Sequence, residues 1–270
     1  MRFLAIIKIA LRALRRNLLR TLLTMLGIIF GILAVISGVS MGAGAKAQIE
    51  ARIASMGQNV VQVMSGTVTR GGVRMGFGSA PTLTQQDLES IRREISDING
   101  VSPEVRSTAQ VVAGNQNHSP NIQGVDVSYV DIRAWPVVNG QNFSESDIRN
   151  ASKVAIIGKT AVKMLFGEGA DPVGQVIRIK NAPFTVIGEL APKGTSNFGS
   201  DQDDTILVPY TSAMKRLTGQ TTGFRSFYIQ ANQPNLLDSV KQQLEVLLRE
   251  RHKIAEGRDT DFIVMTQQEL

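Results

Sequence analysis

The longest apolar stretch of the chain covers residues 21–45, which hold no charged side chain. An α-helix needs about 20 mainly apolar residues to cross the hydrocarbon core of a bilayer, so this stretch predicts a transmembrane helix. A cleaved signal peptide is the alternative, because Ala43, Gly44 and Ala45 resemble a small-residue cleavage site. The apolar part of a signal peptide has about 7–15 residues, and the greater length here favours a helix that stays in the membrane.

Residues 1–20 have the pattern of a cytoplasmic amphipathic helix. Leucine and isoleucine recur along one helical face, and Lys8, Arg12, Arg15 and Arg16 crowd the opposite side. Such a helix can lie in the headgroup layer of a membrane, and binding to a cytoplasmic partner is the second interpretation. Because Lys and Arg are enriched on the cytoplasmic side of transmembrane helices, we expect a cytoplasmic N-terminus and an extracytoplasmic region from residue 46 onward.

Small residues recur along the predicted transmembrane helix at steps of three and four, which places them on one face. A groove of small residues lets helices approach closely in lipid, where close packing drives their association. Glycine is common in membrane helices, so a stripe without any packing role is the alternative. We interpret the stripe as a packing face for further membrane helices; its residues are Gly27, Gly31, Ala34, Gly38, Gly42 and Ala45.

The region of residues 46–270 has the pattern of an α+β fold. It opens with a β-α-β unit that has a strand at 59–64, a helix at 84–97 and an extended segment at 101–113. The signals that delimit the helix are Thr84 and the capping-box residue Asp87 at its start and Asn99-Gly100 at its end.

A second β-α-β unit closes the chain, with strands at 224–231 and 261–265 and a helix that begins at Pro234. Two such units brought together form a split, ferredoxin-like sheet with its helices on one face. In that arrangement, the two ends of the extracytoplasmic domain lie near each other.

Residues 112–223 predict an inserted, β-rich lobe, so that the first lobe consists of residues 46–111 and 224–270. Within the insert we expect a hairpin around Asn181 and a helix from Pro209 that Gly219 ends. The other expected elements are strands at 153–157 and 205–208 and a short helix at 160–166.

Residues 65–81 are rich in glycine and poor in side chains that pack a core, so we expect a mobile loop. Met75 and Phe77 stand among these glycines. We select these two residues as candidate contacts for a partner or a cargo.

The basic character of the chain has a local origin. The sequence has 29 Lys+Arg and 23 Asp+Glu, a formal net charge of +6, and the cations before residue 21 account for the whole excess. A protein that binds nucleic acid spreads basic residues over its binding face, so we expect no nucleic-acid partner. The chain has no cysteine, which excludes disulfides and thiolate metal sites.

Gly158, Lys159 and Thr160 follow a predicted strand and resemble the end of a phosphate-binding loop. Lys153 stands where that motif needs its first glycine, so we expect no ATP at this position. The sequence contains no motif typical of hydrolases or metalloproteases. Trp135 could stack on a ligand, although its place between predicted strands favours the core. We therefore expect no catalytic site, cofactor or metal on this chain.

Two further groups of residues resemble metal ligands. Asp201, Asp203 and Asp204 lack the glycine and the late glutamate of a calcium loop, and a solvated loop is favoured. His118 and His252 lie in different predicted lobes and have no partner pattern, so a metal site is not expected there either.

An ordered series of motifs resembles the periplasmic domain of MacB-type permeases. The series begins with residues 158–166 and 171–174, continues through 177–179 and 184–188, and ends with 201–204 and 207–209. The N-terminal arm and the apolar stretch extend this resemblance over essentially the whole chain. The motifs are specific for the permease superfamily and not for one substrate.

The resemblance implies a permease subunit of an ATP-driven exporter in the bacterial inner membrane. Members of this family have four transmembrane helices, with the large extracytoplasmic domain between the first and the second. They form dimers with a second permease copy and work with an ABC ATPase subunit or domain, which binds ATP and Mg. In Gram-negative relatives, a periplasmic adaptor and an outer-membrane channel join them, and movement of the periplasmic domains is thought to expel the substrate.

The chain departs from the family at residue 270, where the domain should lead back into the membrane. We therefore expect either a fragment or a split gene. The expected function is that of the first transmembrane helix and the extracytoplasmic domain of an export permease. The alternative is a single-pass, membrane-anchored module that binds another protein or acts as a sensor, and no residue favours an anchored enzyme.

Overall fold

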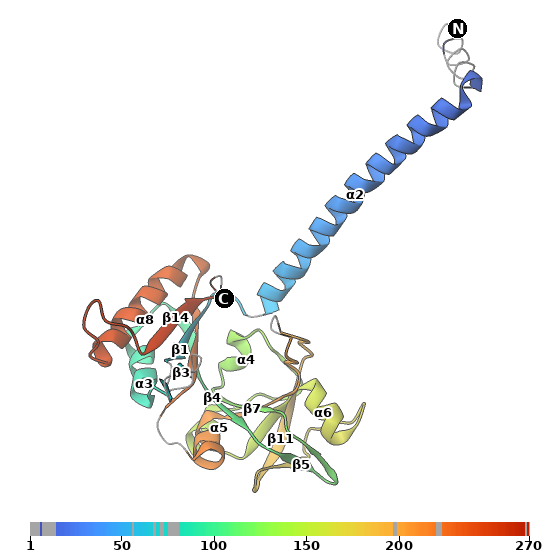
Figure 1. Ribbon diagram of the computed structural model, residues 1–270. Helices are drawn as coiled ribbons and strands as arrows, with labels where there is room; N and C mark the ends of the chain where they lie inside the picture. Colours follow the sequence, from blue (N-terminus) through green and yellow to red (C-terminus); the bar gives the residue numbers. More distant parts are fainter. Residues whose placement is uncertain are drawn as a thin grey trace. The chain divides into compact units, whose positions relative to one another are not determined.

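The computed structural model describes residues 6, 15–55, 57–66, 69–70, 73–74, 81–196, 199–219, 223–267 and 269 (Figure 1). The chain divides into two compact units, Met1–Arg52 and Ile53–Leu270. The strands of the described residues belong to the second unit. Met75 and Phe77 lie outside the described residues.

Helix α2 (Leu18–Ser55) forms the described part of the first unit almost entirely. Its segment Leu18–Lys46 has a mean hydropathy of 2.5 and is long and apolar enough to cross a membrane. The Thr21 and Thr24 hydroxyls each donate a hydrogen bond to a backbone carbonyl one turn earlier, so the helix satisfies them itself. By length and composition, α2 is therefore a candidate transmembrane helix.

Four antiparallel strands form the sheet that the two β-α-β units predict. The strands, in the spatial order β14-β1-β13-β4, alternate with two helices along the chain as in a ferredoxin-like fold. The strands are β1 (Val60–Ser65), β4 (Ile98–Thr108), β13 (Ser226–Ala231) and β14 (Phe262–Thr266). The helices are α3 (Gln85–Glu94) and α8 (Leu237–Arg251), the latter entered through the 3-10 turn η2 (Pro234–Leu236).

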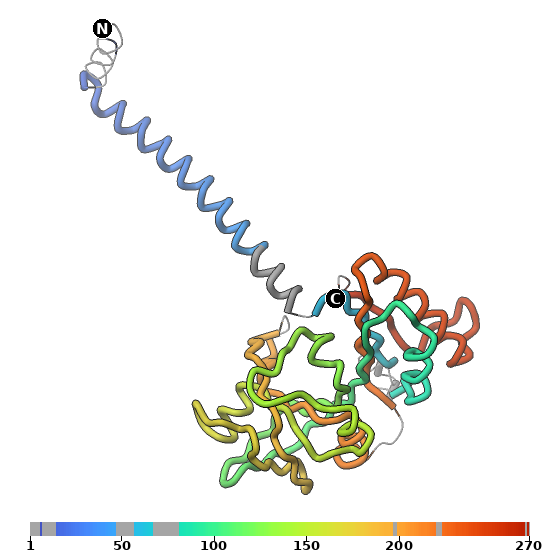
Figure 2. Tube along the Cα trace, turned by 180° about the vertical axis from the view of Figure 1, so that it is seen from behind, coloured from blue at the N-terminus to red at the C-terminus, as the bar shows by residue number. Residues whose placement is uncertain are grey.

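The chain leaves this sheet beside the point where it enters, because β14 pairs with β1 (Figure 2). Val61 lies opposite Thr266, and the N–H of Gln267 donates to the carbonyl of Val60 at 3.1 Å. The expected proximity of the two ends of the domain is confirmed.

Strand β4 continues into a second set of strands. Its residues 98–104 pair with β13, whereas residues 105–108 pair with β7 (Asn121–Val125). From β7 the order continues β12-β9-β11-β10-β5-β6, with β8 beside β11. These strands are β5 (Val111–Ala113), β6 (Gln116–His118), β8 (Val137–Gly140), β9 (Val154–Ile157), β10 (Val176–Ile179), β11 (Ala182–Leu190) and β12 (Thr205–Pro209).

Short helices cover these strands, and a small hairpin stands apart. The helices are α4 (Tyr129–Ile132), α5 (Glu145–Asn150), α6 (Lys159–Phe166) and α7 (Tyr210–Ala213), which continues as the π-helix η1 (Met214–Thr218). The separate hairpin consists of β2 (Thr69–Arg70) and β3 (Val73–Arg74).

Alternate side chains along the strands enter two cores on opposite faces of the sheet. Phe227 and Ile229 of β13 belong to the larger core, which also contains residues of α3, α5, α6, α7 and α8. Tyr228, between them, belongs to the smaller core with residues of α4. Trp135 lies in this smaller core, is 4% exposed, and donates from Nε1 to the carbonyl of Ala191 at 2.6 Å, which confirms its expected burial.

Local signals predicted most element starts correctly, and one predicted end is wrong. Thr84 and Asp87 form a capping box at the start of α3 as expected. The helix ends at Glu94, and Asn99-Gly100, expected to end it, lie in β4 instead. Pairing with β13 prevails there over the turn preference of the dipeptide.

Other predictions for the insert are confirmed, and the elements between residues 116 and 150 were missed. The hairpin around Asn181 is β10–β11, α6 occupies its expected place, and Gly219 ends the helical segment after β12. Helix α5 was not predicted, although Ser144 and Asp147 give it a capping box. The division into lobes at residues 112 and 223 stays a prediction, since β4 pairs in both sets of strands.

Candidate functional site

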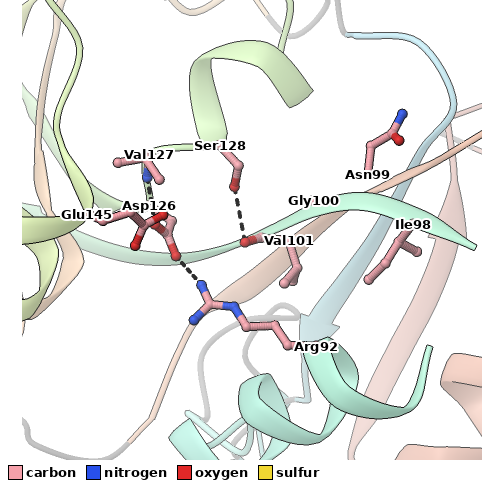
Figure 3. Close-up of a pocket in the computed structure, with 9 residues that line it drawn as sticks. All are labelled: Arg92, Ile98, Asn99, Gly100, Val101, Asp126, Val127, Ser128 and Glu145. Carbon is pink, nitrogen blue, oxygen red and sulfur yellow. Dashed lines mark hydrogen bonds and ion pairs between the residues drawn. The ribbon is translucent and has the colours of Figure 1, made fainter. Parts of the chain in front are cut away.

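A cavity of about 450 Å³ opens between α3, β4 and the turn that follows β7 (Figure 3). It lies beside the part of β4 that pairs with β13, and the turn after β7 closes it on the other side. The lining residues are Arg92 of α3, Ile98, Asn99, Gly100 and Val101 of β4, Asp126, Val127 and Ser128 of the turn, and Glu145 of α5.

Arg92 and Asp126 form an ion pair that joins the two sides of this cavity (Figure 3). Nη2 of Arg92 donates to Oδ2 of Asp126, whose side chain is 4% exposed, whereas that of Arg92 is 41% exposed. The second carboxylate oxygen, Oδ1, accepts a hydrogen bond from the N–H of Val127 at 2.6 Å. Asp126 is thus a buried carboxylate that needs Arg92 as its charged partner.

Two serine hydroxyls fix the turn onto β4. The N–H of Asp126 donates to Oγ of Ser102 at 3.0 Å, and Oγ of Ser128 donates to the carbonyl of Val101 at 3.2 Å. Gly100 of β4 packs against the turn, because a Cβ built at Gly100 would lie 3.2 Å from the Cβ of Ser128. The turn is therefore bound to β4, and the Arg92–Asp126 ion pair connects it to α3.

The amphipathic pattern of α3 positions Arg92. Leu88 and Ile91 are fully buried in the larger core, and the following residue, Arg92, leaves this buried face and lines the cavity. Arg92 also lies in the last turn of α3, where a cation interacts favourably with the C-terminal end of the helix dipole.

The cavity offers charges and hydrogen-bonding groups without an arrangement for making or breaking bonds. Its lining has a guanidinium, two carboxylates, an amide and a hydroxyl, and no nucleophile beside a base. Over the described part of the chain, no group of three or more His, Cys, Asp and Glu residues could hold a metal ion. The arrangement suits ionic contact with another molecule or movement of α3 against the turn.

Among the described residues, none of those selected from the sequence lines this cavity. The glycine stripe is on α2, and an added Cβ at Gly27, Gly31, Gly38 or Gly42 would meet nothing within 4 Å. The sequence reasoning missed the Arg92–Asp126 ion pair, because its partners are 34 residues apart and share no spacing motif.

The resemblance to a phosphate-binding loop has a structural explanation. The N–H groups of Thr160 and Ala161, at the start of α6, donate to the carbonyl of Asp203 at 3.2 and 3.4 Å. A Cβ on Gly158 would lie 2.4 Å from the same oxygen. The chain itself thus occupies the two amides that would otherwise be available to a phosphate.

The interpretation of the acidic residues as a solvated loop is wrong for Asp203, which is 7% exposed. Its carboxylate accepts hydrogen bonds from the N–H groups of Lys193 and Gly194 at 2.7 and 2.9 Å. Asp201 accepts from the hydroxyl of Thr160 at 2.7 Å, and Asp204 pairs with His118 at 2.7 Å. These carboxylates hold the segment between β11 and β12 in place.

These features define an α+β module with a ferredoxin-like sheet, preceded by a helix able to cross a membrane. The sequence matches the MacB-like periplasmic core domain over residues 21–247. The chain belongs to this family.

Curated relatives are similar in sequence to this chain over most of its length. The macrolide export ATP-binding/permease protein MacB of Syntrophobacter fumaroxidans is 44% identical over 213 residues, which are 78% of this chain and 30% of that protein. The pyoverdine export ATP-binding/permease protein PvdT of Pseudomonas syringae pv. syringae is 35% identical over 209 residues, 77% of this chain and 31% of that protein. The chain spans about a third of the length of these relatives.

Solved structures agree with the fold. The periplasmic region of MacB from Actinobacillus actinomycetemcomitans has a TM-score of 0.65 at 22% identity and covers 80% of this chain and 92% of that one. The extracellular domain of the noncanonic ABC-type transporter YknZ from Gram-positive bacteria has a TM-score of 0.59 at 16% identity, with 77% of this chain and 100% of that one covered. At these identities, the likeness concerns the fold.

Proposed function

We propose that this chain provides the first transmembrane helix and the extracytoplasmic domain of an export permease. In this proposal the domain transmits movement from ATP-driven components in order to expel a substrate or engage an adaptor. The relatives named for the export of macrolides and of pyoverdine support it. The observation that carries it is the pairing of Val61 with Thr266, because a domain whose ends adjoin can be inserted between two membrane helices and moved by them.

The proposal includes a topology and a set of partners. Helix α2 crosses the bacterial inner membrane, with its basic N-terminal arm in the cytoplasm and the second unit outside. The proposed partners are an ABC ATPase subunit or domain that binds ATP and Mg, a second permease copy, a periplasmic adaptor and an outer-membrane channel. The glycine stripe is the proposed contact for other membrane helices. Met75 and Phe77 remain the proposed contacts for a partner or a cargo.

Within the domain, two connections cross the cavity region and carry the proposed movement. One is β4, which pairs first with β13 and then with β7. The other is the Arg92–Asp126 ion pair between α3 and the turn. Because β4 is continuous, rotation about it would open or close the cavity, and the ion pair would limit that rotation.

A crosslink across the cavity tests this mechanism in a complete transporter reconstituted with its ATPase. The chain has no cysteine, so Asn99→Cys with Glu145→Cys introduces the one reactive pair of this chain on exposed lining positions, in a transporter whose other cysteines are replaced by Ser. A bismaleimide that joins these cysteines should fix the cavity and reduce export at least tenfold, while the ATPase keeps turning over ATP.

The matched control places the same reagent on one rigid element. Gln85→Cys with Glu89→Cys lies within α3, one helical turn apart, and its crosslink should leave export unchanged. Normal export after crosslinking of the cavity pair would contradict transmission of movement through this region. Loss of export in both crosslinked proteins would show damage by the reagent and would also remove the support for the mechanism.

A further inference from the structure

Strand β14 is the edge of the ferredoxin-like sheet in the described part of the chain, because it pairs with β1 alone. The register shows which of its backbone groups point away from β1. The N–H of Gln267 donates to the carbonyl of Val60 at 3.1 Å, so the residues of odd number direct their N–H and C=O groups toward β1. The residues whose backbone groups point outward, to the open side of the sheet, are Phe262, Val264 and Thr266.

Glu269 covers one end of this open edge. Its carboxylate accepts a hydrogen bond from the N–H of Thr266 at 2.8 Å, and its own N–H donates to the carbonyl of Thr266 at 3.1 Å. Nζ of Lys241, on α8, donates to the other carboxylate oxygen of Glu269 at 2.6 Å. The hydrogen bonds from Lys241 and Thr266 lower the pKa of Glu269, so the carboxylate is ionised at neutral pH. Glu269 thus occupies both outward backbone groups of Thr266.

Thr260 covers the other end of the edge more weakly. Its hydroxyl donates to the outward carbonyl of Phe262 at 2.7 Å, which is a single hydrogen bond between neutral groups. Val264 lies between the two covered positions, and no strand of the described residues pairs with its outward N–H and C=O. The edge is therefore open at its middle, and the stronger of its two covers is the charged group of Glu269.

The side chains of β14 offer no further protection against pairing with another strand. Phe262–Thr266 contains no charged residue and no proline, and its register with β1 has no bulge. Charges, prolines and bulges are the features that keep edge strands of natural proteins apart. At the other end of the strand order, β6 is three residues long and polar. Of these two terminal strands, β14 is the one suited to accept another strand.

Strand β14 is complementary to a second copy of itself. In an antiparallel pair centred on Val264, the two Val264 residues exchange both hydrogen bonds, and Phe262 of each copy lies opposite Thr266 of the other. The half-exposed Ile263 then lies opposite Met265 of the second copy, where the two side chains form an apolar cross-strand contact. No charge on either strand opposes this pairing, so a second copy of the chain is the partner that fits this edge.

We propose that β14 is a pairing edge for a second copy of this chain, and that Glu269, held by Lys241, is a latch that closes this edge in the single copy. Release of Glu269 frees both outward groups of Thr266, and the ferredoxin-like sheets of two copies then join into one continuous sheet. This inference does not depend on the proposed export function, because it concerns the association of the chain with itself.

Disulfide formation between two single-cysteine proteins tests the pairing and its register. The chain has no cysteine, so Ile263→Cys in one full chain and Met265→Cys in another place two thiols opposite each other in the proposed pair. Opposed residues that are not hydrogen-bonded to each other are close enough for a disulfide, whereas two copies of the same variant place their thiols diagonally, about 7–8 Å apart. Mixed in detergent micelles under mild oxidation, the two proteins should form more heterodimers than homodimers.

The role of the latch is tested by adding Glu269→Ala to both proteins. The yield of heterodimer should rise about tenfold, because neither copy then has to give up a charge-assisted hydrogen bond before pairing. Glu250→Ala is the matched control, because Glu250 is an exposed glutamate of α8, and it should leave the yield unchanged.

Analytical ultracentrifugation of the full chain without added cysteines gives an independent readout. At equal concentration, Glu269→Ala should show a larger dimer fraction than wild type. The absence of heterodimers in the Glu269→Ala background, or homodimers as abundant as heterodimers, would overturn the proposed pairing. Equal yields with and without Glu269→Ala, or equal dimer fractions in the centrifuge, would overturn the role of Glu269 as a latch.

Discussion

The two faces of the sheet hold different charged clusters. On the face covered by α3 and α8, His252 lies between two carboxylates. On the face covered by α4, the amine of the half-buried Lys193 donates to the carbonyl of Arg133 at 2.6 Å, and Arg133 is a second half-buried cation. The Lys193 amine lies 4.9 Å from the centre of the Trp135 ring, and the Arg133 guanidinium lies 5.2 Å from that of Tyr228.

This difference shows how neighbouring charge determines the response of a buried group to pH. Carboxylates accept hydrogen bonds from a charged imidazole, whereas burial and a nearby guanidinium disfavour a charged amine. On the face covered by α4, stability should therefore depend on pH through the amine of Lys193. The larger core below α3 and α8 is aliphatic and aromatic, and its contribution should not depend on pH.

The largest expected effect concerns this larger core. Leu244 of α8 is fully buried, and Val246 of the same helix is 67% exposed. Leu244→Ala removes buried methyl groups and leaves a cavity, so the free energy of unfolding should fall by about 2–5 kcal/mol at every pH. Val246→Ala should change it by less than about 0.5 kcal/mol. Urea titration of both variants measures this, and equal losses would mean that the core does not hold α8.

A smaller loss is expected on the opposite face, where Glu104 is the buried carboxylate. Its oxygens accept from Nε of Arg106 at 2.8 Å and from the Ser226 hydroxyl at 2.7 Å, and its side chain is 1% exposed. Glu104→Gln removes the charged partner of Arg106 and should cost about 1–3 kcal/mol. Glu94→Gln breaks the exposed pair with Arg93 and should cost at most about 1 kcal/mol. Similar losses in the two variants would contradict a distinct role for buried charge on this face.

The contacts that sequence reasoning found are those made between neighbours along the chain. Thr84 and Asp87 predicted the start of α3, because a cap depends on residues three positions apart. The same reasoning could have found α5 from Ser144 and Asp147. The β-α-β patterns sufficed for the ferredoxin-like sheet, since their order along the chain limits how the strands can pair.

The charged clusters could not be found in this way. His118 and His252 were interpreted as having no partner pattern, and both have carboxylate partners, 86 residues away for His118. Arg92 reaches Asp126 only because β4 continues from one set of strands into the next. Such contacts depend on the register of strands that are distant in sequence, and composition or spacing does not reveal that register.

The sharpest test of the comparison is the pH dependence of Lys193. Burial, together with the neighbouring Arg133, lowers the pKa of its amine to about 7, and Asp203 opposes this shift. An unfolded lysine keeps its proton up to about pH 10.4, so between pH 7 and that value the unfolded chain binds more protons than the folded chain. Stability from this residue should therefore rise with pH across this window, whereas below pH 7 the folded chain bears the full cost of the buried charge.

Lys193→Met keeps the length of the side chain and removes the amine. Relative to wild type, the variant should be most stable near pH 6.5, and its advantage should shrink as the pH rises to 9.5. Lys163→Met is the control, because Lys163 is 60% exposed and lies 3.5 Å from Glu168 on the surface, where its replacement should matter little at any pH.

Urea titrations at pH 6.5, 8 and 9.5 compare the three proteins. A difference between Lys193→Met and wild type that does not change with pH would remove the contrast between the two faces, because the amine would then carry the same charge in the folded and unfolded chains. A difference that narrows with pH for Lys193→Met would establish that the buried amine changes its charge on folding.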